Sequence, residues 1–206
     1  MLVTRHDAVT LARMSLSNQK AGGSVRIIGG EWRSRRLSFP DADGLRPTAD
    51  RVRETLFNWL QLSVPAARVL DLFAGSGALA FEAASRGASR VLMVERNGAV
   101  AASLRANRDK LGAETMQIVQ ADAQAWLDQK AAAAGPFDIV FMDPPFAESM
   151  HESMLQALAK AACLAPGALI YLETPAALEA TMIPENWRVA KRKRAGAVFS
   201  TLLQAA

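Results

Sequence analysis

From Arg68 onward, short apolar segments alternate with longer segments of helical periodicity, and this alternation restricts the possible folds more than any other feature. The apolar segments predict strands at 68–73, 90–95, 115–120, 137–142 and 168–173. The segments that follow them predict helices at 78–86, 98–111, 122–133 and 148–162. Since each helix joins strands that run in the same direction, the sequence predicts a doubly wound α/β fold with a parallel sheet.

Both ends of the chain depart from this alternation. Residues 187–194 and 197–203 flank Ala195-Gly196, a hairpin signal that makes the last strand antiparallel. Near the N-terminus, residues 25–28 and 32–39 flank Gly29-Gly30-Glu31, a second hairpin signal. The sequence therefore predicts a disordered extension over 1–24, a basic hairpin and helix over 25–62, and the α/β domain over 63–206.

The loop over residues 71–77, Asp-Leu-Phe-Ala-Gly-Ser-Gly, joins the first strand of this domain to its first helix. A strand, a glycine turn and a helix in this order are typical of a nucleotide- or nucleoside-binding corner. Gly75 and Gly77 allow a sharp bend and a close approach of the ligand to the backbone. Glu95 follows the second strand, where a carboxylate can bind ribose hydroxyls. Asp122 follows the third strand and can accept a hydrogen bond from an adenine amino group, or cap the next helix.

This pattern has a second interpretation. Gly75, Gly77 and Ala80, together with Glu95, also fit the alanine variant of the dinucleotide fingerprint. On the glycine pattern alone, a nicotinamide-dependent oxidoreductase is therefore an alternative.

The tetrapeptide Asp143-Pro144-Pro145-Phe146 favours a different chemistry. It follows the apolar strand 137–142, and its two prolines end that strand in a rigid, extended turn. The Asp143 carboxylate and the Pro144 carbonyl can accept both N–H hydrogens of a planar amine, while the Phe146 ring stacks on the base. These groups suit methyl transfer to an exocyclic amino group of a nucleobase, and a hydride-transfer enzyme has no use for them.

The net positive charge of the chain comes from its N-terminal part. Residues 1–60 contain ten Lys and Arg against six Asp and Glu, whereas the remaining residues contain fourteen of each. A basic appendage on a neutral body predicts a polyanionic substrate such as nucleic acid, although a solvated charged face is the alternative. The candidate RNA-contacting residues are Arg33, Arg35, Arg36, Arg46, Arg51 and Arg53. Thr48 is the expected N-cap of a helix that reaches Leu60.

Composition argues against a disulfide-bonded, zinc-binding, membrane-spanning or secreted protein. Cys163 is the single cysteine, so an internal disulfide is impossible, and His6 and His151 have no cysteine partners for a zinc site. No apolar run is long enough to cross a bilayer, and the first residues do not have the pattern of a signal peptide. We therefore expect a cytoplasmic protein without a metal or membrane contact, of a size that permits a monomer.

Several of these motifs together resemble a known family. The 71–77 loop, Glu95-Arg96-Asn97, Asp122 and the turn from Asp143 resemble those of the Rossmann-like S-adenosylmethionine-dependent amino-methyltransferases. Within that group, segments 26–32 (Arg-Ile-Ile-Gly-Gly-Glu-Trp) and 46–58 (Arg-Pro-Thr-Ala-Asp-Arg-Val-Arg-Glu-Thr-Leu-Phe-Asn) resemble the RsmD family. That family methylates the 2-amino group of guanine 966 in bacterial 16S ribosomal RNA. The resemblance covers about residues 25–204 and leaves residues 1–23 without a counterpart.

The resemblance implies a seven-stranded sheet, S-adenosylmethionine as methyl donor, no metal, and 16S ribosomal RNA in a small-subunit assembly particle as partner. The implied donor-binding residues are Asp71, Phe73, Ala74, Gly75, Ser76, Gly77, Glu95, Arg96, Asp122 and Ala123. The implied catalytic residues are Asp143, Pro144, Pro145 and Phe146. Phe73 stands where many methyltransferases have the first glycine of the loop, although Phe suits this family. Two alternatives stay open: an adenine-N6 methyltransferase acting on DNA or another RNA, and an RNA-binding assembly factor that has lost catalysis.

Overall fold

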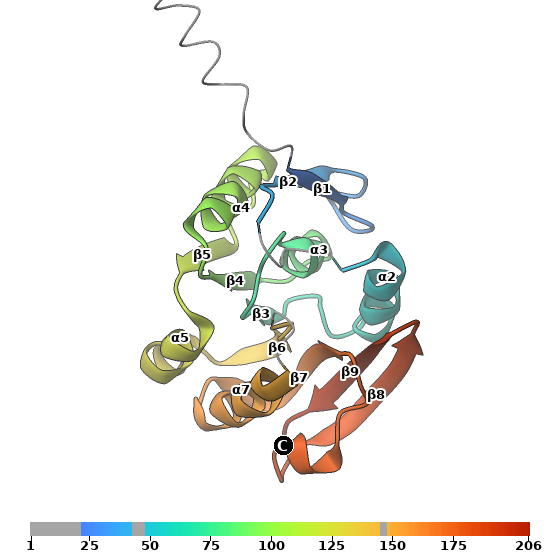
Figure 1. The fold of residues 1–206 in the computed structure, drawn as a ribbon. Helices are drawn as coiled ribbons and strands as arrows, with labels where there is room; N and C mark the ends of the chain where they lie inside the picture. Colours follow the sequence, from blue (N-terminus) through green and yellow to red (C-terminus); the bar gives the residue numbers. More distant parts are fainter. Residues whose placement is uncertain (1–21, 43–47, 145–147) are drawn as a thin grey trace, which may run out of the picture.

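The computed structural model describes residues 22–42, 48–144 and 148–206. Within them, seven strands form one sheet in the order β5-β4-β3-β6-β7-β9-β8 (Figure 1). The strands are β3 (Arg68–Asp71), β4 (Arg90–Glu95), β5 (Met116–Gln120), β6 (Phe137–Phe141), β7 (Leu164–Thr174), β8 (Arg188–Ala195) and β9 (Val198–Gln204). Strands β3 to β7 are parallel, and β9 runs antiparallel to both β7 and β8. The predicted doubly wound sheet with an antiparallel last strand is confirmed.

Helices cover both faces of this sheet (Figure 1). They are α2 (Asp50–Trp59), α3 (Ala78–Ser85), α4 (Gly98–Leu111), α5 (Ala123–Gln129), α6 (Ala131–Ala134) and α7 (Glu148–Lys160), with a short 3-10 helix η1 at Ala180–Met182. Alternate strand residues face opposite sides: Val69 and Met93 join the core with α3 and α4, whereas Leu70 and Val94 join the core with α5 and α7. The predicted helix at 122–133 is divided at Lys130, whose φ of −128° leaves the helical range. None of the described helices is both long and apolar enough to cross a bilayer.

The N-terminal hairpin consists of β1 (Gly23–Arg26) and β2 (Arg36–Phe39). Its second arm is shorter than predicted, because residues 31–34 form a turn in which Ser34 has a φ of 68°. Arg33 and Arg35, which lie within the predicted arm, therefore both precede β2. Strand β1 also begins inside the segment predicted to be an extension, of which residues 1–21 lie outside the described residues.

Helix α3 is buried on all sides, because the sheet covers one side and the hairpin and α2 cover the other (Figure 1). Its one charged residue, Glu82, is fully buried and accepts hydrogen bonds from the backbone N–H groups of Ile28 (2.7 Å) and Gly29 (2.8 Å). Arg86 donates to the same carboxylate at 2.7 Å, and Arg53 Nη1 lies 3.6 Å from it. Glu82 thus fastens the hairpin to the α/β core.

The prediction that Arg53 contacts RNA is wrong. Its side chain is fully buried, and it donates to the carbonyls of Thr48 (3.2 Å) and Arg26 (2.9 Å) and to the Asp50 carboxylate (2.6 Å). With its guanidinium committed to these groups and to Glu82, Arg53 has no surface to offer RNA. Thr48 is not the N-cap either, since α2 begins one residue later than a Thr48 cap would place it and has no side-chain cap.

Candidate functional site

The carboxyl ends of β3, β4, β6 and β7 border one cavity of about 620 Å³. It brings together most of the predicted site residues: Asp71, Phe73, Ala74, Gly75, Ser76, Glu95, Arg96, Asp122, Ala123, Asp143 and Pro144. Gly77 does not line the cavity. The predicted residues Arg46, Pro145 and Phe146 lie outside the described residues. A cavity at the carboxyl ends of the strands is where open α/β sheets bind ligands.

The shape of the 71–77 loop depends on its glycines and on Glu95. Gly75 and Gly77 have φ values of 50° and 76°, a region that favours glycine. A Cβ on Gly77 would also lie 2.7 Å from Phe81 and Leu104 atoms, so this glycine permits close packing of the helix. The Glu95 carboxylate accepts hydrogen bonds from the N–H groups of Gly75 (2.9 Å) and Asn97 (2.7 Å). Glu95 therefore holds the loop beside the end of β4.

Asp122 has the capping role that was one of its two interpretations. It is the N-cap of α5, and its carboxylate accepts a hydrogen bond from the Ala125 N–H at 3.1 Å. Its side chain is nevertheless exposed and borders the cavity, so capping leaves it accessible to a ligand.

Burial raises the pKa of three carboxyl groups that line the cavity, those of Asp71, Asp143 and Glu173. The pKa of Asp71, which is 4 % exposed, rises to about 7, mainly because burial disfavours its charged form. Burial likewise raises the pKa of Asp143 to about 8, and the nearby Glu173 and Asp71 carboxylates add to this shift. Among the described residues, Asp143 has no hydrogen-bond donor and no ion-pair partner. A cation or an N–H donor entering the cavity would stabilise its charged form.

The charge of the lining also constrains the ligand. The described lining contains five carboxyl groups, those of Asp71, Glu95, Asp122, Asp143 and Glu173, and one guanidinium, that of Arg96. This excess of carboxylates suits a ligand that carries positive charge or many N–H donors.

The sequence analysis missed Glu173 at the end of β7. Its carboxylate accepts a hydrogen bond from the Tyr171 hydroxyl at 3.0 Å and lines the cavity. His151 of α7 lies close by, with its Nε2 3.0 Å from the Glu173 carbonyl oxygen. The signal that could have found Glu173 is its position: like Asp143, it is an acidic residue at the carboxyl end of a parallel strand.

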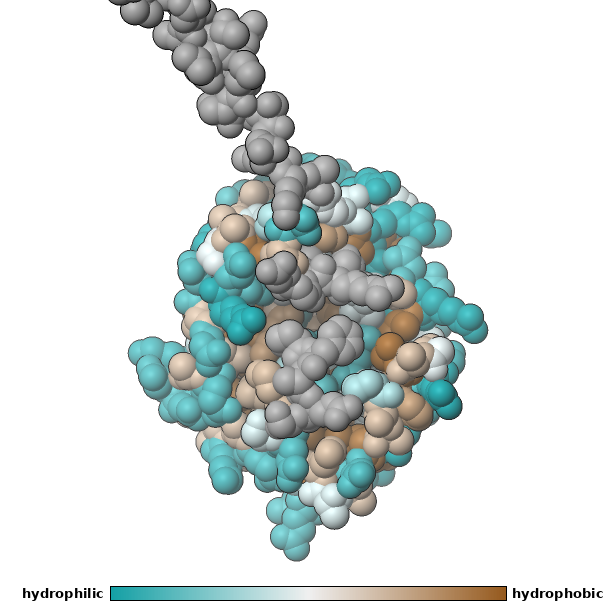
Figure 2. Space-filling view, viewed as in Figure 1, coloured by the Kyte–Doolittle hydropathy of each residue, from teal (hydrophilic) through white to brown (hydrophobic). Residues whose placement is uncertain are grey.

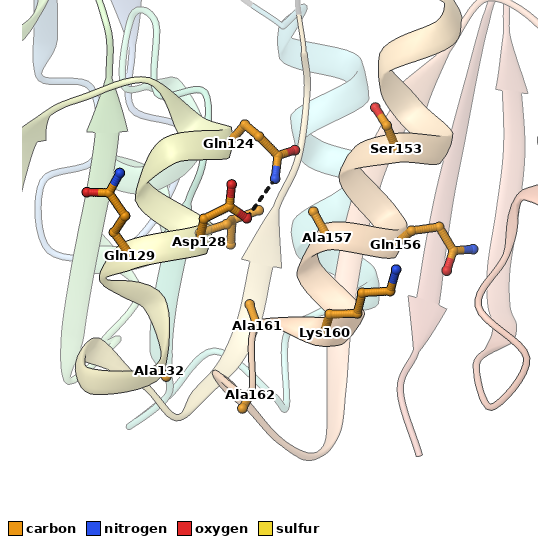
Figure 3. A pocket seen from close by; sticks show the side chains of 11 residues that line it. Gln124, Asp128, Gln129, Ala132, Ser153, Gln156, Ala157, Lys160, Ala161 and Ala162 are labelled. Carbon is orange, nitrogen blue, oxygen red and sulfur yellow. Dashed lines mark hydrogen bonds between the residues drawn. The ribbon is translucent and has the colours of Figure 1, made fainter.

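A second groove, of about 690 Å³, lies between α5 and α7 (Figure 3). Its polar residues include Asp128, which accepts a hydrogen bond from the Gln124 amide at 3.0 Å, and Lys160. None of the predicted site residues lines it. In the part of the chain that the structure describes, no three His, Cys, Asp or Glu side chains are arranged to hold a metal ion.

Exposed basic residues form two groups, one on the N-terminal hairpin and α2 and one on the edge strand β8. Arg33, Arg35 and Arg36 of the hairpin and Arg51 of α2 are exposed, as predicted for RNA contacts. Lys191 to Arg194 form a second exposed run on the edge strand β8, and Lys193 Nζ lies 3.2 Å from Thr55 Oγ1 of α2. The turn of the β8–β9 hairpin lines the cavity through Ala197 and Val198. In the face drawn in Figure 2, hydrophilic side chains form the rim and apolar residues gather nearer the centre.

Comparison with known proteins agrees with this arrangement. The family described as conserved hypothetical protein 95 matches residues 25–204. Ribosomal RNA small subunit methyltransferase D of Escherichia coli is 44% identical over 93% of this chain and 95% of its own length, and that of Haemophilus influenzae is 41% identical over 92% and 98%. The solved structure of the putative methyltransferase yhhF from Escherichia coli, 44% identical, superposes with a TM-score of 0.81 and covers 89% of this chain and 98% of that one. The chain therefore belongs to the RsmD family of methyltransferases.

Proposed function

We propose that this protein transfers a methyl group from S-adenosylmethionine to the 2-amino group of a guanine in 16S ribosomal RNA. The observation that carries the proposal is the Asp143 carboxylate, which has no partner among the described residues and shares one cavity with the 71–77 loop. Membership of the RsmD family supports ribosomal RNA as the substrate. The choice of guanine 966 rests on the resemblance of segments 26–32 and 46–58 to that family.

The residues of the cavity fit the methyl donor. S-adenosylmethionine carries a sulfonium and an ammonium group, and when bound it supplies a methyl group already activated by the positive sulfur. The carboxyl-rich lining favours these charges, and Asp71 and Asp143 lie where a cation would stabilise their charged forms. Glu95 and Asp122 are the acceptors for the ribose hydroxyls and the adenine amine, with Phe73, Ala74, Gly75, Ser76, Arg96 and Ala123 around them.

Asp143 and Pro144 then act on the target amine. The lone pair of a guanine amino group is delocalised into the ring, so the amine is a poor nucleophile. Hydrogen bonds from its two N–H groups to the Asp143 carboxylate and the Pro144 carbonyl localise the lone pair toward the methyl group. The same carboxylate stabilises the positive charge that develops on nitrogen. Phe146 stacks on the base, a contact worth roughly 1–3 kcal/mol.

The basic surfaces hold the RNA around this cavity. Arg33, Arg35, Arg36 and Arg51 contact phosphates from the N-terminal side, together with Arg46. The exposed run Lys191–Arg194 on β8 extends this surface past the cavity, because β8 lies beside α2. The protein acts in the cytoplasm as a monomer, on RNA within a small-subunit assembly particle.

Nucleoside mass spectrometry tests this function. Small-subunit RNA from cells that lack the protein should have lost one N2-methylguanosine, and the wild-type gene should restore it. A gene carrying Asp143→Ala should not restore it, although the purified variant should bind S-adenosylmethionine as tightly as the wild type. Loss of an N6-methyladenosine instead would favour the adenine-N6 alternative, and unchanged RNA would refute the proposal.

A further inference from the structure

Asp143 and Glu173 lie at the carboxyl ends of the neighbouring strands β6 and β7. Strands β6 and β7 are parallel, with Phe141 paired to Tyr171, and the Met142 N–H donates to the Tyr171 carbonyl at 2.8 Å. Asp143 and Glu173 each follow this pair by two residues: Glu173 is still in β7, whereas Asp143 lies two residues past the end of β6. The two side chains are close enough for the Glu173 carboxylate to raise the pKa of Asp143. Both side chains line the same cavity. The cavity therefore presents two carboxylates next to each other.

The Glu173 carboxylate is held in place from several elements. The Tyr171 hydroxyl, on a fully buried side chain, donates to Glu173 at 3.0 Å and lies 3.1 Å from Ser200 Oγ on β9. The side chain of Thr48, before α2, also forms a hydrogen bond with Glu173. A carboxylate can accept about four hydrogen bonds, so these two leave acceptor capacity toward the cavity. Within the described residues, no cation pairs with Glu173.

Two adjacent acceptors distinguish guanine from its relatives. The Watson–Crick edge of guanine presents the N1–H donor directly beside the N2 amino group. Adenine presents an N1 acceptor beside its amino group, and so does 2-aminopurine, which keeps the 2-amino group of guanine. A carboxylate opposite N1 attracts the guanine N1–H and repels the lone pair of the other two bases.

We propose that Glu173 recognises the substrate base by accepting a hydrogen bond from guanine N1–H, while Asp143 and Pro144 accept those of the 2-amino group. This role rests on the proposed function. It makes Glu173 a substrate-recognising residue that selects guanine. It also gives a physical reason for the position of Glu173 beside Asp143, where its charge raises the cost of charging Asp143.

The test compares two substrates that differ at N1. Small-subunit particles are reconstituted with RNA that carries either guanine or 2-aminopurine at the target position, and kcat/KM for methyl transfer is measured for each. Wild-type protein should prefer guanine by at least about tenfold, because 2-aminopurine leaves Glu173 facing an acceptor. In Glu173→Gln the amide N–H can donate to N1 of 2-aminopurine, so this preference should fall by at least about tenfold. Glu179→Gln, the same change at an exposed glutamate outside the cavity, should leave the preference unchanged.

The outcomes show whether Glu173 recognises the base or only supports the structure of the cavity. Donor affinity measured by calorimetry should be equal in wild type and Glu173→Gln, and an equal loss of kcat/KM on both substrates would overturn the proposal. If Glu173→Gln does not fold, Glu173→Asp replaces it: its carboxylate should keep the preference for guanine at lower kcat/KM, and loss of that preference would also overturn the proposal. Wild-type protein inactive on guanine RNA would overturn the proposed function as well, whereas an active wild type with no preference would overturn only the role of Glu173.

Discussion

Replacing Asp143 with asparagine should make the folded protein more stable at neutral pH. The change keeps the shape of the side chain and removes its ionisation. Burial, with help from Glu173 and Asp71, raises the pKa of Asp143 from 3.8 to about 8. Between these two values the folded protein binds this proton more tightly than the unfolded chain does. The carboxyl group therefore makes the fold less stable as pH rises through this window.

The size of the effect follows from the same values. Each pH unit in this window costs the folded state about 1.4 kcal/mol, so the upper bound at pH 7 is about 4 kcal/mol. Asp143 is partly exposed to the cavity, where water screens its charge, and we expect about 1–3 kcal/mol. Asp71 and Glu173, whose pKa values are also raised, are present in both wild type and Asp143→Asn. The difference in the free energy of unfolding between these two proteins therefore reports on Asp143 and its coupling to Asp71 and Glu173.

Urea unfolding of wild type and Asp143→Asn at several pH values between about 5 and 8 measures this difference. The free energy of unfolding of the variant should exceed that of the wild type by about 1–3 kcal/mol near pH 8, and by less near pH 5. Asp41→Asn, at an exposed residue outside the cavity, is the matched control and should show little difference. A variant that is no more stable than wild type, or a difference independent of pH, would refute the reasoning. A stability gain accompanied by lost turnover would mark Asp143 as a residue kept for function.

Three other predictions concern the buried arginine, the cavity loop and the basic strand β8. Arg53→Ala should lower the free energy of unfolding by about 2–5 kcal/mol, because it leaves a cavity in place of a fully buried side chain and removes its hydrogen bonds to Thr48, Arg26 and Asp50. Arg51→Ala, at an exposed residue of the same helix, should leave stability nearly unchanged and weaken RNA binding. Gly77→Ala should cost about 1–3 kcal/mol in urea unfolding because of its positive φ and its close neighbours; a neutral result would contradict the packing described. The double change Lys191→Glu and Lys193→Glu should weaken RNA binding and flatten its salt dependence in filter-binding assays while donor affinity stays the same; unaltered RNA binding would exclude β8 from the interface.

The alternation of strands and helices could be predicted from the sequence because it depends on local periodicity. Strand β4 and helix α4 have the predicted bounds, and the antiparallel end of the sheet follows from the turn at Gly196. Asp143 was found because two prolines mark its turn. Glu173 has no such mark: it continues an apolar strand, and only the register of β6 and β7 reveals that it stands beside Asp143.

Arg53 shows where local reasoning fails. The sequence made it a candidate RNA-contacting residue, because an arginine in a helix is usually exposed to solvent. Its partner Glu82 lies far along the sequence, and the packing of α2 against α3 that joins them is a tertiary feature. One signal was available: Glu82 is the single charged residue in the otherwise apolar α3, and a buried carboxylate requires a cation or several N–H donors.

The most direct test of the account is to identify the methylated atom in a purified system. Small-subunit particles from cells that lack the protein are incubated with S-adenosylmethionine bearing a deuterated methyl group and either wild-type protein or Asp143→Ala. Wild-type protein should give deuterated N2-methylguanosine, and the variant should give none. Deuterium on adenine N6, or equal labelling by the two proteins, would contradict it.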